Sequence, residues 1–502
     1  METPRKDRWR LFLVPREGVR PPAGRAHVDG WDDLEAREQA LGIRPGQWFL
    51  LEDGEPGDPD LLAFFGPGSP LTRKAEGTRR SYARDLKVHF EFLARNGKSW
   101  RDATPDDFAD YEFWRRRDPD NPGRVAGSKF NREVAACRLF YEWQVRVRQT
   151  LTTSPVKVGE VRRRDGSVAQ TADLRSRDVR ANRVNWLTPR AYRRWRDVGL
   201  DGYRGDGLRE PGWRGRNDVR NLAFADLLWT TGLRLREAGT LLTLELPRAR
   251  SGVDFPKGRV ADAVAKGAGR SFWISSVTLA RVATYLNSTR SEAISRARAL
   301  GRYDRMRGIR QVRDFSFDRR DVTYVDEDGV LGQVQLDALD ENERTRLFVT
   351  GPGGLEPAWL WLGESGLPML PASWEVVFDR ANDRCERYGL PDLFCRPHML
   401  RHSFALLMLI GIQYRHDRRF GLTPEERQEH RELFGDPFWL VKELLGHRRI
   451  ETTRDTYLAP MAEIQVDELL NDSADQFEFI TTILARIAAS DPRVIDVDAD
   501  QQ

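Results

Sequence analysis

A histidine and a tyrosine near the C-terminus are the residues of this sequence most clearly suited to catalysis. Residues 444–458 read Leu-Leu-Gly-His-Arg-Arg-Ile-Glu-Thr-Thr-Arg-Asp-Thr-Tyr-Leu, so His447 and Tyr457 lie ten residues apart on one segment. Tyrosine is a poor nucleophile at neutral pH, because its phenol has a pKa of about 10. A lone tyrosine is more often a packing residue, and one that attacks a phosphodiester needs cations around it.

The first cationic segment is residues 230–237, which read Thr-Thr-Gly-Leu-Arg-Leu-Arg-Glu. A glycine ends one apolar helix there, and Arg234 starts the next, where an arginine beside backbone amides can approach a phosphate. Glu237 lies one turn later and could orient Arg234. For this segment alone, a helix-capping salt bridge is the simpler interpretation.

The second segment, Ala-Lys-Gly-Ala-Gly-Arg, places Lys266 at the tip of a predicted hairpin, with Arg270 at its end as a candidate DNA contact. An ammonium group there could enter a groove and give its proton to a departing oxygen. Most hairpin-tip lysines are merely solvated, and Lys257 is the nearest rival for this role.

The third segment is His398-Met-Leu-Arg401-His402, which leads into the apolar run 404–412. Its i, i+3 spacing puts His398 and Arg401 on one helical face. A buried, hydrogen-bonded histidine is the usual alternative. Strongly polar residues that open so apolar a helix need partners.

An all-helical unit is predicted for residues 69–155, with the first 68 residues as an irregular extension of unknown role. Apolar residues recur at helical spacing from Thr78, a Thr104-Pro-Asp-Asp cap opens a second helix, and a third covers about 128–149. The first helix has a basic face that we interpret as a DNA contact, although one solvated face is the simpler reading. This face carries Arg79, Arg80, Arg84 and Lys87.

Residues 156–185 contain eight Lys or Arg residues against four acidic ones, with little apolar content. We interpret them as an exposed linker whose basic excess, including Arg162, Arg163 and Arg164, would suit a phosphate backbone. A solvated linker without a partner is the alternative.

A larger unit is predicted for residues 186–460. Helical patterns cover 189–198, 219–229, 372–388, 398–412 and 438–445, and a hairpin joins 258–265 to 270–276. Alternating segments around Asp328-Gly329 predict an added hairpin within an insertion near 300–345, and a second insertion covers 413–437. The tail 461–502 is predicted to be helical and is a candidate for docking on a neighbouring copy, with packing on its own chain as the alternative.

Composition limits the classes of protein. The 502 residues allow several domains, the net charge is only +4, and the longest apolar run is shorter than a bilayer requires. Three scattered cysteines fit neither a disulfide framework nor a zinc site. We therefore expect a cytoplasmic protein without a membrane span, metal ion or other cofactor.

The four segments, in this order, resemble the active-site signature of the tyrosine recombinases, the phage integrase family. They carry Arg234, Lys266, His398 with Arg401, and His447 with Tyr457. The resemblance covers most of residues 70–460, and residues 78–155 are similar to the family's core-binding domain. It implies a mainly α fold with a small antiparallel β element, in which a helical core-binding (SAM-like) domain and a catalytic domain form a DNA clamp.

The resemblance also implies a reaction. Tyr457 would attack a DNA phosphodiester and form a 3′-phosphotyrosyl link, while Arg234 and Arg401 stabilise the developing negative charge. Lys266 would protonate the leaving 5′-oxygen.

His398 would assist proton transfer from the tyrosine, His447 would hydrogen-bond the phosphate, and Glu237 would play a supporting role. Two features depart from the commonest pattern. The step from His447 to Tyr457 is one residue longer, and the hairpin tip lacks a second basic residue, for which Arg270 could stand in.

The expected function is site-specific recombination for integration, excision or transposition of a mobile element. The expected partner is double-stranded DNA at paired sites, bound by a homotetramer, with helper recombinases or accessory DNA-bending proteins. Two alternatives stay open: a type IB topoisomerase-like enzyme that relaxes DNA, and a non-catalytic DNA-binding regulatory protein.

Overall fold

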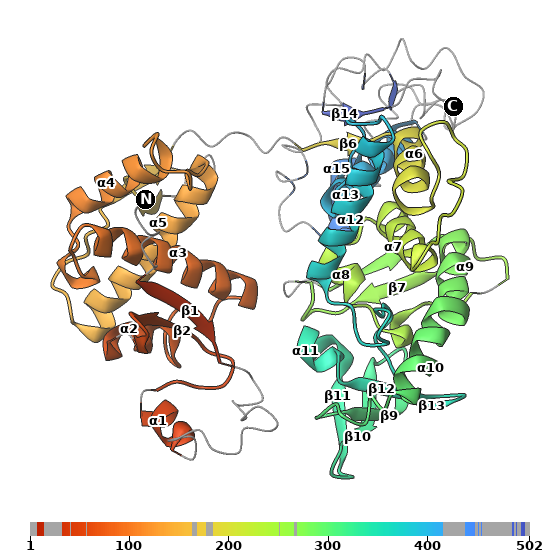
Figure 1. Cartoon of the computed structure of the whole chain (residues 1–502), viewed down its shortest axis with the longest axis horizontal. Helices are drawn as coiled ribbons and strands as arrows, with labels where there is room; N and C mark the ends of the chain where they lie inside the picture. The colour runs from red at the N-terminus through yellow and green to blue at the C-terminus, as the bar shows by residue number, and fades with distance from the viewer. Residues whose placement is uncertain are drawn as a thin grey trace, which may run out of the picture. The chain divides into compact units, whose positions relative to one another are not determined.

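The structure is a computed structural model that describes residues 8–14, 33–40, 42–56, 58–162, 168–176, 184–249, 251–265, 269–414, 437–446, 450, 453, 484–485, 488 and 493–496. The chain divides into two compact units, residues 1–182 and 183–502 (Figure 1). Each unit has its own hydrophobic core. Among the described helices, none is long and apolar enough to cross a bilayer.

The first unit is built on α3 (Glu76–Arg95), α4 (Pro105–Arg116) and α5 (Gly127–Trp143), with short turns η1 (Trp100–Asp102) and η2 (Gln144–Arg148). The cap expected at Thr104 is present. Its backbone N–H donates to Asp107 Oδ2 at 2.8 Å, and the Asp107 N–H donates to Thr104 Oγ1 at 3.3 Å. The predicted helices are therefore confirmed, with α3 starting two residues before the expected Thr78.

The first 68 residues contain β1 (Trp9–Leu13), α1 (Leu34–Ala40), β2 (Trp48–Glu52), β3 (Glu55–Pro56) and α2 (Pro59–Phe65). Of these elements, β1, β2 and α2 share the core of the three helices. The strands form an antiparallel sheet in the order β1-β2-β3. Trp9 packs against Phe90 at 5.4 Å between ring centroids, and Phe64 packs against Phe140 at 5.2 Å. Burial of these rings makes this segment part of the helical unit.

Part of the segment that we interpreted as an exposed linker is also anchored in the first unit. Strands β4 (Val158–Arg162) and β5 (Val168–Ala172) pair antiparallel. The Ser176 N–H donates to Asn131 Oδ1 at 2.8 Å, which ties the segment to α5. Valine and threonine in these strands favour a pleated conformation over a solvated coil. The Arg162 side chain and residues 163–164 lie outside the described residues.

Helices surround the core of the second unit. They are α6 (Pro189–Leu200), α7 (Asp218–Thr231), α8 (Leu235–Gly239), η3 (Thr243–Glu245), α9 (Ser276–Tyr285), η4 (Leu286–Arg290), α10 (Ser291–Ala299), α12 (Pro371–Arg387), α13 (Pro397–Tyr414) and α15 (Pro437–Leu445). Tryptophans from distant segments meet here: Trp374 stacks on Phe224 at 3.5 Å and lies edge-on to Trp361 at 5.8 Å. The helices expected in this unit are confirmed within a few residues.

The expected hairpin is β7 (Lys257–Val260) with β8 (Arg270–Trp273). The insertion contains β9 (Arg310–Ser316), β10 (Asp321–Val325), β11 (Leu331–Gln335), η5 (Leu336–Ala338), α11 (Glu341–Arg344), β12 (Leu347–Gly351) and β13 (Gly354–Pro357). Its sheet has the order β11-β10-β9-β12-β13.

Strands β9 and β12 of this sheet run parallel. The expected small antiparallel element is present as β7–β8, and the mixed sheet is an addition that was not expected. The chain is mainly helical, but its largest sheet is mixed and has five strands. Only the β10–β11 hairpin of this sheet was expected, because its Asp-Gly turn is a local signal whereas the other pairings join distant segments.

A short strand near the C-terminus pairs with the start of the same unit. β14 (Val494–Ile495) runs parallel to β6 (Trp186–Leu187), and the Thr188 N–H donates to Ile495 O at 3.0 Å. Asp496 binds Arg190 at 2.7 Å. The described end of the tail is thus a strand docked on its own chain; most of the predicted helical tail lies outside the described residues.

Candidate active site

The turn between α7 and α8 has the conformation expected from its sequence. Gly232 ends α7 with φ +62°, and a Cβ built there would lie 2.3 Å from Phe404 Cδ1, so the position requires glycine. Arg234 is the residue before α8, and its backbone N–H donates to Glu237 Oε2 at 2.8 Å. The local sequence therefore fixes Arg234 and Glu237 relative to each other.

Glu237 is fully buried and binds two arginines from different elements. Arg234 Nη1 donates to its Oε1 at 2.6 Å, and Arg270 on β8 donates from Nη1 and Nη2 at 2.8 and 2.7 Å. Burial by itself would raise the pKa of Glu237. The hydrogen bonds and charge of Arg270, with the charges of Arg234 and Arg401, outweigh burial and lower this pKa to about 2. The carboxylate is ionised at every physiological pH.

Three guanidinium groups also bind the end of α15, where the last carbonyls of a helix lack partners within the helix. Arg270 Nε donates to Leu444 O at 3.1 Å, Arg401 Nη2 donates to Leu445 O, and Arg234 Nη2 donates to Gly446 O at 3.2 Å. The residues that follow directly are Gly446-His447. The arginine cluster, defined as Arg234, Arg270 and Arg401 around Glu237, therefore positions the segment that leads to the expected nucleophile.

Arg401 joins this cluster to the α7–α8 turn. It lies on α13 with 1 % of its surface exposed, and its Nη1 donates to Gly232 O at 2.7 Å. Gly446 has φ +63°, and a Cβ there would lie 2.8 Å from Arg270 Cδ. The cluster thus packs closely against the backbone at both ends. Arg234 is its most accessible member, with 26 % of its side chain exposed against 9 % for Arg270.

His398 lies in the first turn of α13 and is exposed, so the alternative of a buried core histidine is wrong. Its ring lies edge-on to that of His402, with 4.5 Å between centroids. The i, i+4 spacing accounts for this contact. Both imidazoles therefore belong to the same end of the helix that carries Arg401.

Lys266, His447 and Tyr457 lie outside the described residues, and their placement stays a prediction. The hairpin arms that flank Lys266 are described. Its rival Lys257 pairs with Trp273, at the end of the hairpin away from the 261–269 connection, and its Nζ lies 5.7 Å from the Trp273 ring centroid.

Arg270 is the residue whose importance the sequence understated. We expected it among the DNA contacts or as a substitute for a second basic hairpin residue. The structure places it in the buried arginine cluster, where it binds Glu237 with both terminal nitrogens. The only sequence signal was an arginine that directly follows the glycine-rich hairpin tip.

On the first unit, α3 carries the expected basic face. Arg80 and Arg84 are exposed, whereas Arg79 is partly buried and bound to Glu76. Lys87 is half-buried. The opposite face of this helix buries Asp85, which binds Arg132 at 2.9 Å.

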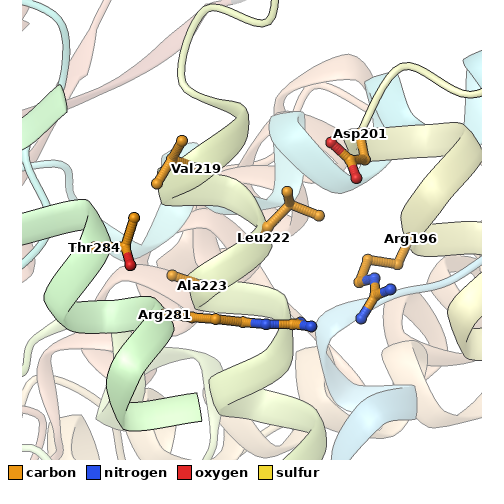
Figure 2. A pocket seen from close by; sticks show the side chains of 7 residues that line it. All are labelled: Arg196, Asp201, Val219, Leu222, Ala223, Arg281 and Thr284. Atoms are coloured by element: carbon orange, nitrogen blue, oxygen red, sulfur yellow. The ribbon is translucent and has the colours of Figure 1, made fainter. Parts of the chain in front are cut away.

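A cavity of about 250 Å³ lies between α6, α7 and α9, apart from the arginine cluster (Figure 2). It is lined by Arg196, Asp201, Val219, Leu222, Ala223, Arg281 and Thr284. Both arginines bind Asp226, Arg196 at 3.4 Å. Arg196 also binds Asp197 at 2.7 Å, and Asp201 lines the cavity, so the carboxylates compensate both arginines and leave no excess positive charge for an anion.

Parts of this chain are similar to known proteins. Residues 70–147 match the model of the phage integrase N-terminal SAM-like domain. No curated protein matches the chain. Among solved structures, XerH recombinase bound to palindromic difH in a post-cleavage complex has a TM-score of 0.42 and 12 % identity, over 78 % of each chain.

XerH bound to difH in a pre-cleavage complex has a TM-score of 0.40 and 13 % identity, over 77 % of this chain and 79 % of that one. XerA recombinase has a TM-score of 0.27 and 15 % identity, over 78 % and 92 %. Residues 70–147, which include α3 to α5 of the first unit, are therefore similar to a phage integrase SAM-like domain. The predicted resemblance to the phage integrase, or tyrosine recombinase, family is confirmed by this match.

Proposed function

We propose that this protein is a site-specific DNA recombinase that cleaves and rejoins DNA through a 3′-phosphotyrosine at Tyr457. The observation that carries the proposal is the arginine cluster. Three cations, from the start of α8, from β8 and from α13, meet around one ionised carboxylate and bind the last carbonyls before His447. Preorganised cations of this kind stabilise the charge that develops on a phosphodiester under attack. The SAM-like domain supports DNA as the substrate.

In this proposal, Arg234 and Arg401 bind the non-bridging oxygens of the scissile phosphate. Arg234 is the accessible member, and its Nη2 hydrogen bond to Gly446 O can be exchanged for one to a phosphate oxygen. Glu237 and Arg270 act as positioning residues, because their mutual bonds hold Arg234 in place. Glu237 needs its low pKa for this role, since a protonated carboxyl would release one arginine.

The bond changes balance without an external energy source. The Tyr457 oxygen attacks phosphorus while the bond from phosphorus to the 5′-oxygen breaks. The tyrosine proton passes to His398, Lys266 gives a proton to the leaving 5′-oxygen, and His447 donates a hydrogen bond to the phosphate. Attack by a 5′-hydroxyl on the phosphotyrosine reverses these changes and reseals the strand.

The biological role that we propose is integration, excision or transposition of a mobile element. The core-binding and catalytic domains would clamp duplex DNA, and the exposed Arg80 and Arg84 would contact phosphates. A homotetramer would act on two paired sites in the cytoplasm, with helper recombinases or DNA-bending proteins where the reaction requires them.

A covalent trap tests the mechanism. DNA is selected from a random pool by its binding to the protein, and is then presented as a duplex nicked near the scissile position, so that cleavage releases a short fragment. Wild type should accumulate a protein–DNA adduct that survives denaturant. Tyr457→Phe should bind this DNA equally well and form no adduct. Equal adduct from both proteins would contradict the assignment of the nucleophile.

A topoisomerase-like enzyme is the main rival. It shares the nucleophile and the cations but relaxes any supercoiled plasmid without joining two sites. Wild type should recombine two selected sites on one plasmid and leave a plasmid without them unchanged. Relaxation of both plasmids without recombinant product would favour the rival, and binding without any adduct would favour a regulatory protein.

A further inference from the structure

Strand β11 forms an open edge of the inserted sheet. The strand order is β11-β10-β9-β12-β13, and in the part of the chain that the structure describes no strand pairs with the outer side of β11. The sheet lies at one end of the second unit (Figure 1). An open edge offers backbone donors and acceptors to another strand.

The hydrogen bonds of the β10–β11 ladder show which groups face outward. The Asp326 N–H donates to Val330 O at 3.1 Å, and the Leu336 N–H donates to Arg320 O at 2.8 Å. Hydrogen-bonded pairs alternate along an antiparallel ladder, so the even-numbered residues of β11 bond to β10. Leu331, Gln333 and Gln335 therefore direct their N–H and C=O groups away from the sheet.

This edge lacks the features that usually block strand addition. Its sequence, Leu-Gly-Gln-Val-Gln, contains no charged residue and no proline. Leu331 is 68 % exposed, and the preceding Val330 is 59 % exposed. The opposite edge of the sheet is blocked: β13 ends in Pro357, and Arg298 on α10 binds its Gly354 and Leu355 carbonyls at 2.6 and 2.9 Å.

We infer that β11 is a self-association edge, on which two copies of this chain pair antiparallel about a two-fold axis at Gln333. In this register Gln333 faces its own counterpart and Leu331 faces Gln335. About six new backbone hydrogen bonds would form, and no like charges would lie opposite each other. The pairing does not depend on the proposed chemistry.

Charge at the ends of the hairpin selects the antiparallel arrangement. The β10–β11 turn carries Asp326, Glu327 and Asp328, and the turn at the other end of β10 carries Asp318 and the exposed Arg319. A parallel pair would set the two acidic turns side by side. The antiparallel pair separates them by about ten residues of strand, roughly 33 Å. It also brings each Asp328 toward the end of the sheet where the partner's Arg319 lies.

A cysteine scan tests both the contact and its register. One strand pair buries less area than a standard interface, so a covalent trap is the suitable readout. With Gln333→Cys, the two Cα atoms would lie about 5.5 Å apart, within the disulfide range. With Leu331→Cys or Gln335→Cys, like residues would lie about 14 Å apart. The native cysteines are buried, which limits background crosslinking.

On full-length protein under a glutathione redox buffer, Gln333→Cys should form disulfide-linked dimers at least about tenfold faster than either flanking variant. A mixture of Leu331→Cys and Gln335→Cys should crosslink faster than each alone. Equal rates for the three single variants would overturn the pairing, and fastest crosslinking at Leu331→Cys would overturn the register.

A proline variant provides a matched control within the Gln333→Cys background. Gln335→Pro removes an N–H that β10 does not use, so the sheet itself is preserved. Gln335→Ala removes the same side chain but keeps the N–H. Proline should slow crosslinking to the rate of the flanking variants, alanine should not, and the melting temperatures should agree. Equal crosslinking by the two would overturn strand addition.

Discussion

Two buried glutamates eight residues apart, Glu237 and Glu245, have similar local structure and different surroundings. Each lies at the third position of a short helix and accepts a hydrogen bond from the backbone N–H three residues earlier, at 2.8 and 3.0 Å. Each binds two arginines. A buried carboxylate with two arginines is therefore no evidence of function by itself.

The remaining bonds of the arginines separate the two clusters. Around Glu245, Arg344 and Arg320 are both buried, and they bind Thr240 O, Leu336 O and Asp337. This cluster joins the inserted sheet to the end of α8. Around Glu237, the arginines bind the end of α15, and Arg234 is partly accessible. The Glu245 cluster is buried on all sides. In the Glu237 cluster, the partly accessible Arg234 has a backbone bond that a ligand could replace.

The largest expected effect is on the closed cluster. Glu245→Ala would leave Arg320 and Arg344 buried with too little negative charge, which should destabilise the second unit by about 3–5 kcal/mol. Urea unfolding would measure this loss. The matched Glu245→Gln variant keeps the shape and should lose a similar amount; full stability of both would show that the cluster does not hold the sheet.

Arg234→Ala should affect chemistry rather than folding. Loss of one preorganised donor should lower the rate of covalent adduct formation by about 10²–10³-fold. The melting temperature should change little, because this side chain is partly exposed. Arg236→Ala, two residues along, is the control, and it should retain most of the cleavage rate. A large loss of stability in Arg234→Ala would show that the Glu237 cluster, like the Glu245 cluster, mainly stabilises the fold.

The low pKa of Glu237 predicts an acid-dependent loss of stability. Its pKa is about 2 in the folded protein and about 4.5 when unfolded. The stabilisation, about 3 kcal/mol, is therefore complete above pH 4.5 and is lost as the pH falls from 4.5 toward 2. Urea unfolding at pH 6 and pH 3 measures this slope, which should be shallower in Glu237→Gln. Identical slopes would contradict the ionised state.

The smallest expected effect concerns the surface pair that flanks both clusters. Arg236 Nε donates to Glu341 Oε2 at 3.1 Å, which links α8 to α11 of the insertion. Both side chains are partly exposed, so Glu341→Gln should cost no more than about 1 kcal/mol. Its adduct rate should match wild type within about twofold. A loss as large as that of Glu245→Ala would show that the sheet positions α8 through this pair.

Much of the fold could be predicted because its signals are local. The Thr104 cap, the Gly232 turn and the apolar periodicity of α13 act within a few residues, where backbone geometry and side-chain spacing decide the structure. The packing of Trp9 against Phe90 and the parallel pair β9–β12 could not be predicted, because they join segments that carry no matching local pattern.

The sequence by itself indicated which residues could do chemistry: two arginines at helix starts, an adjacent glutamate, a hairpin lysine, a histidine one turn before the second arginine, and a histidine and a tyrosine after a glycine turn. Only the tertiary structure decided that Arg270 joins the arginine cluster, and that the cluster around Glu237, unlike the one around Glu245, includes a partly accessible arginine. Residues 232, 270, 401 and 446 meet across more than 200 positions of chain. Packing of the helices brings these distant residues together. It therefore decides which groups surround a charged side chain, and those groups set its pKa.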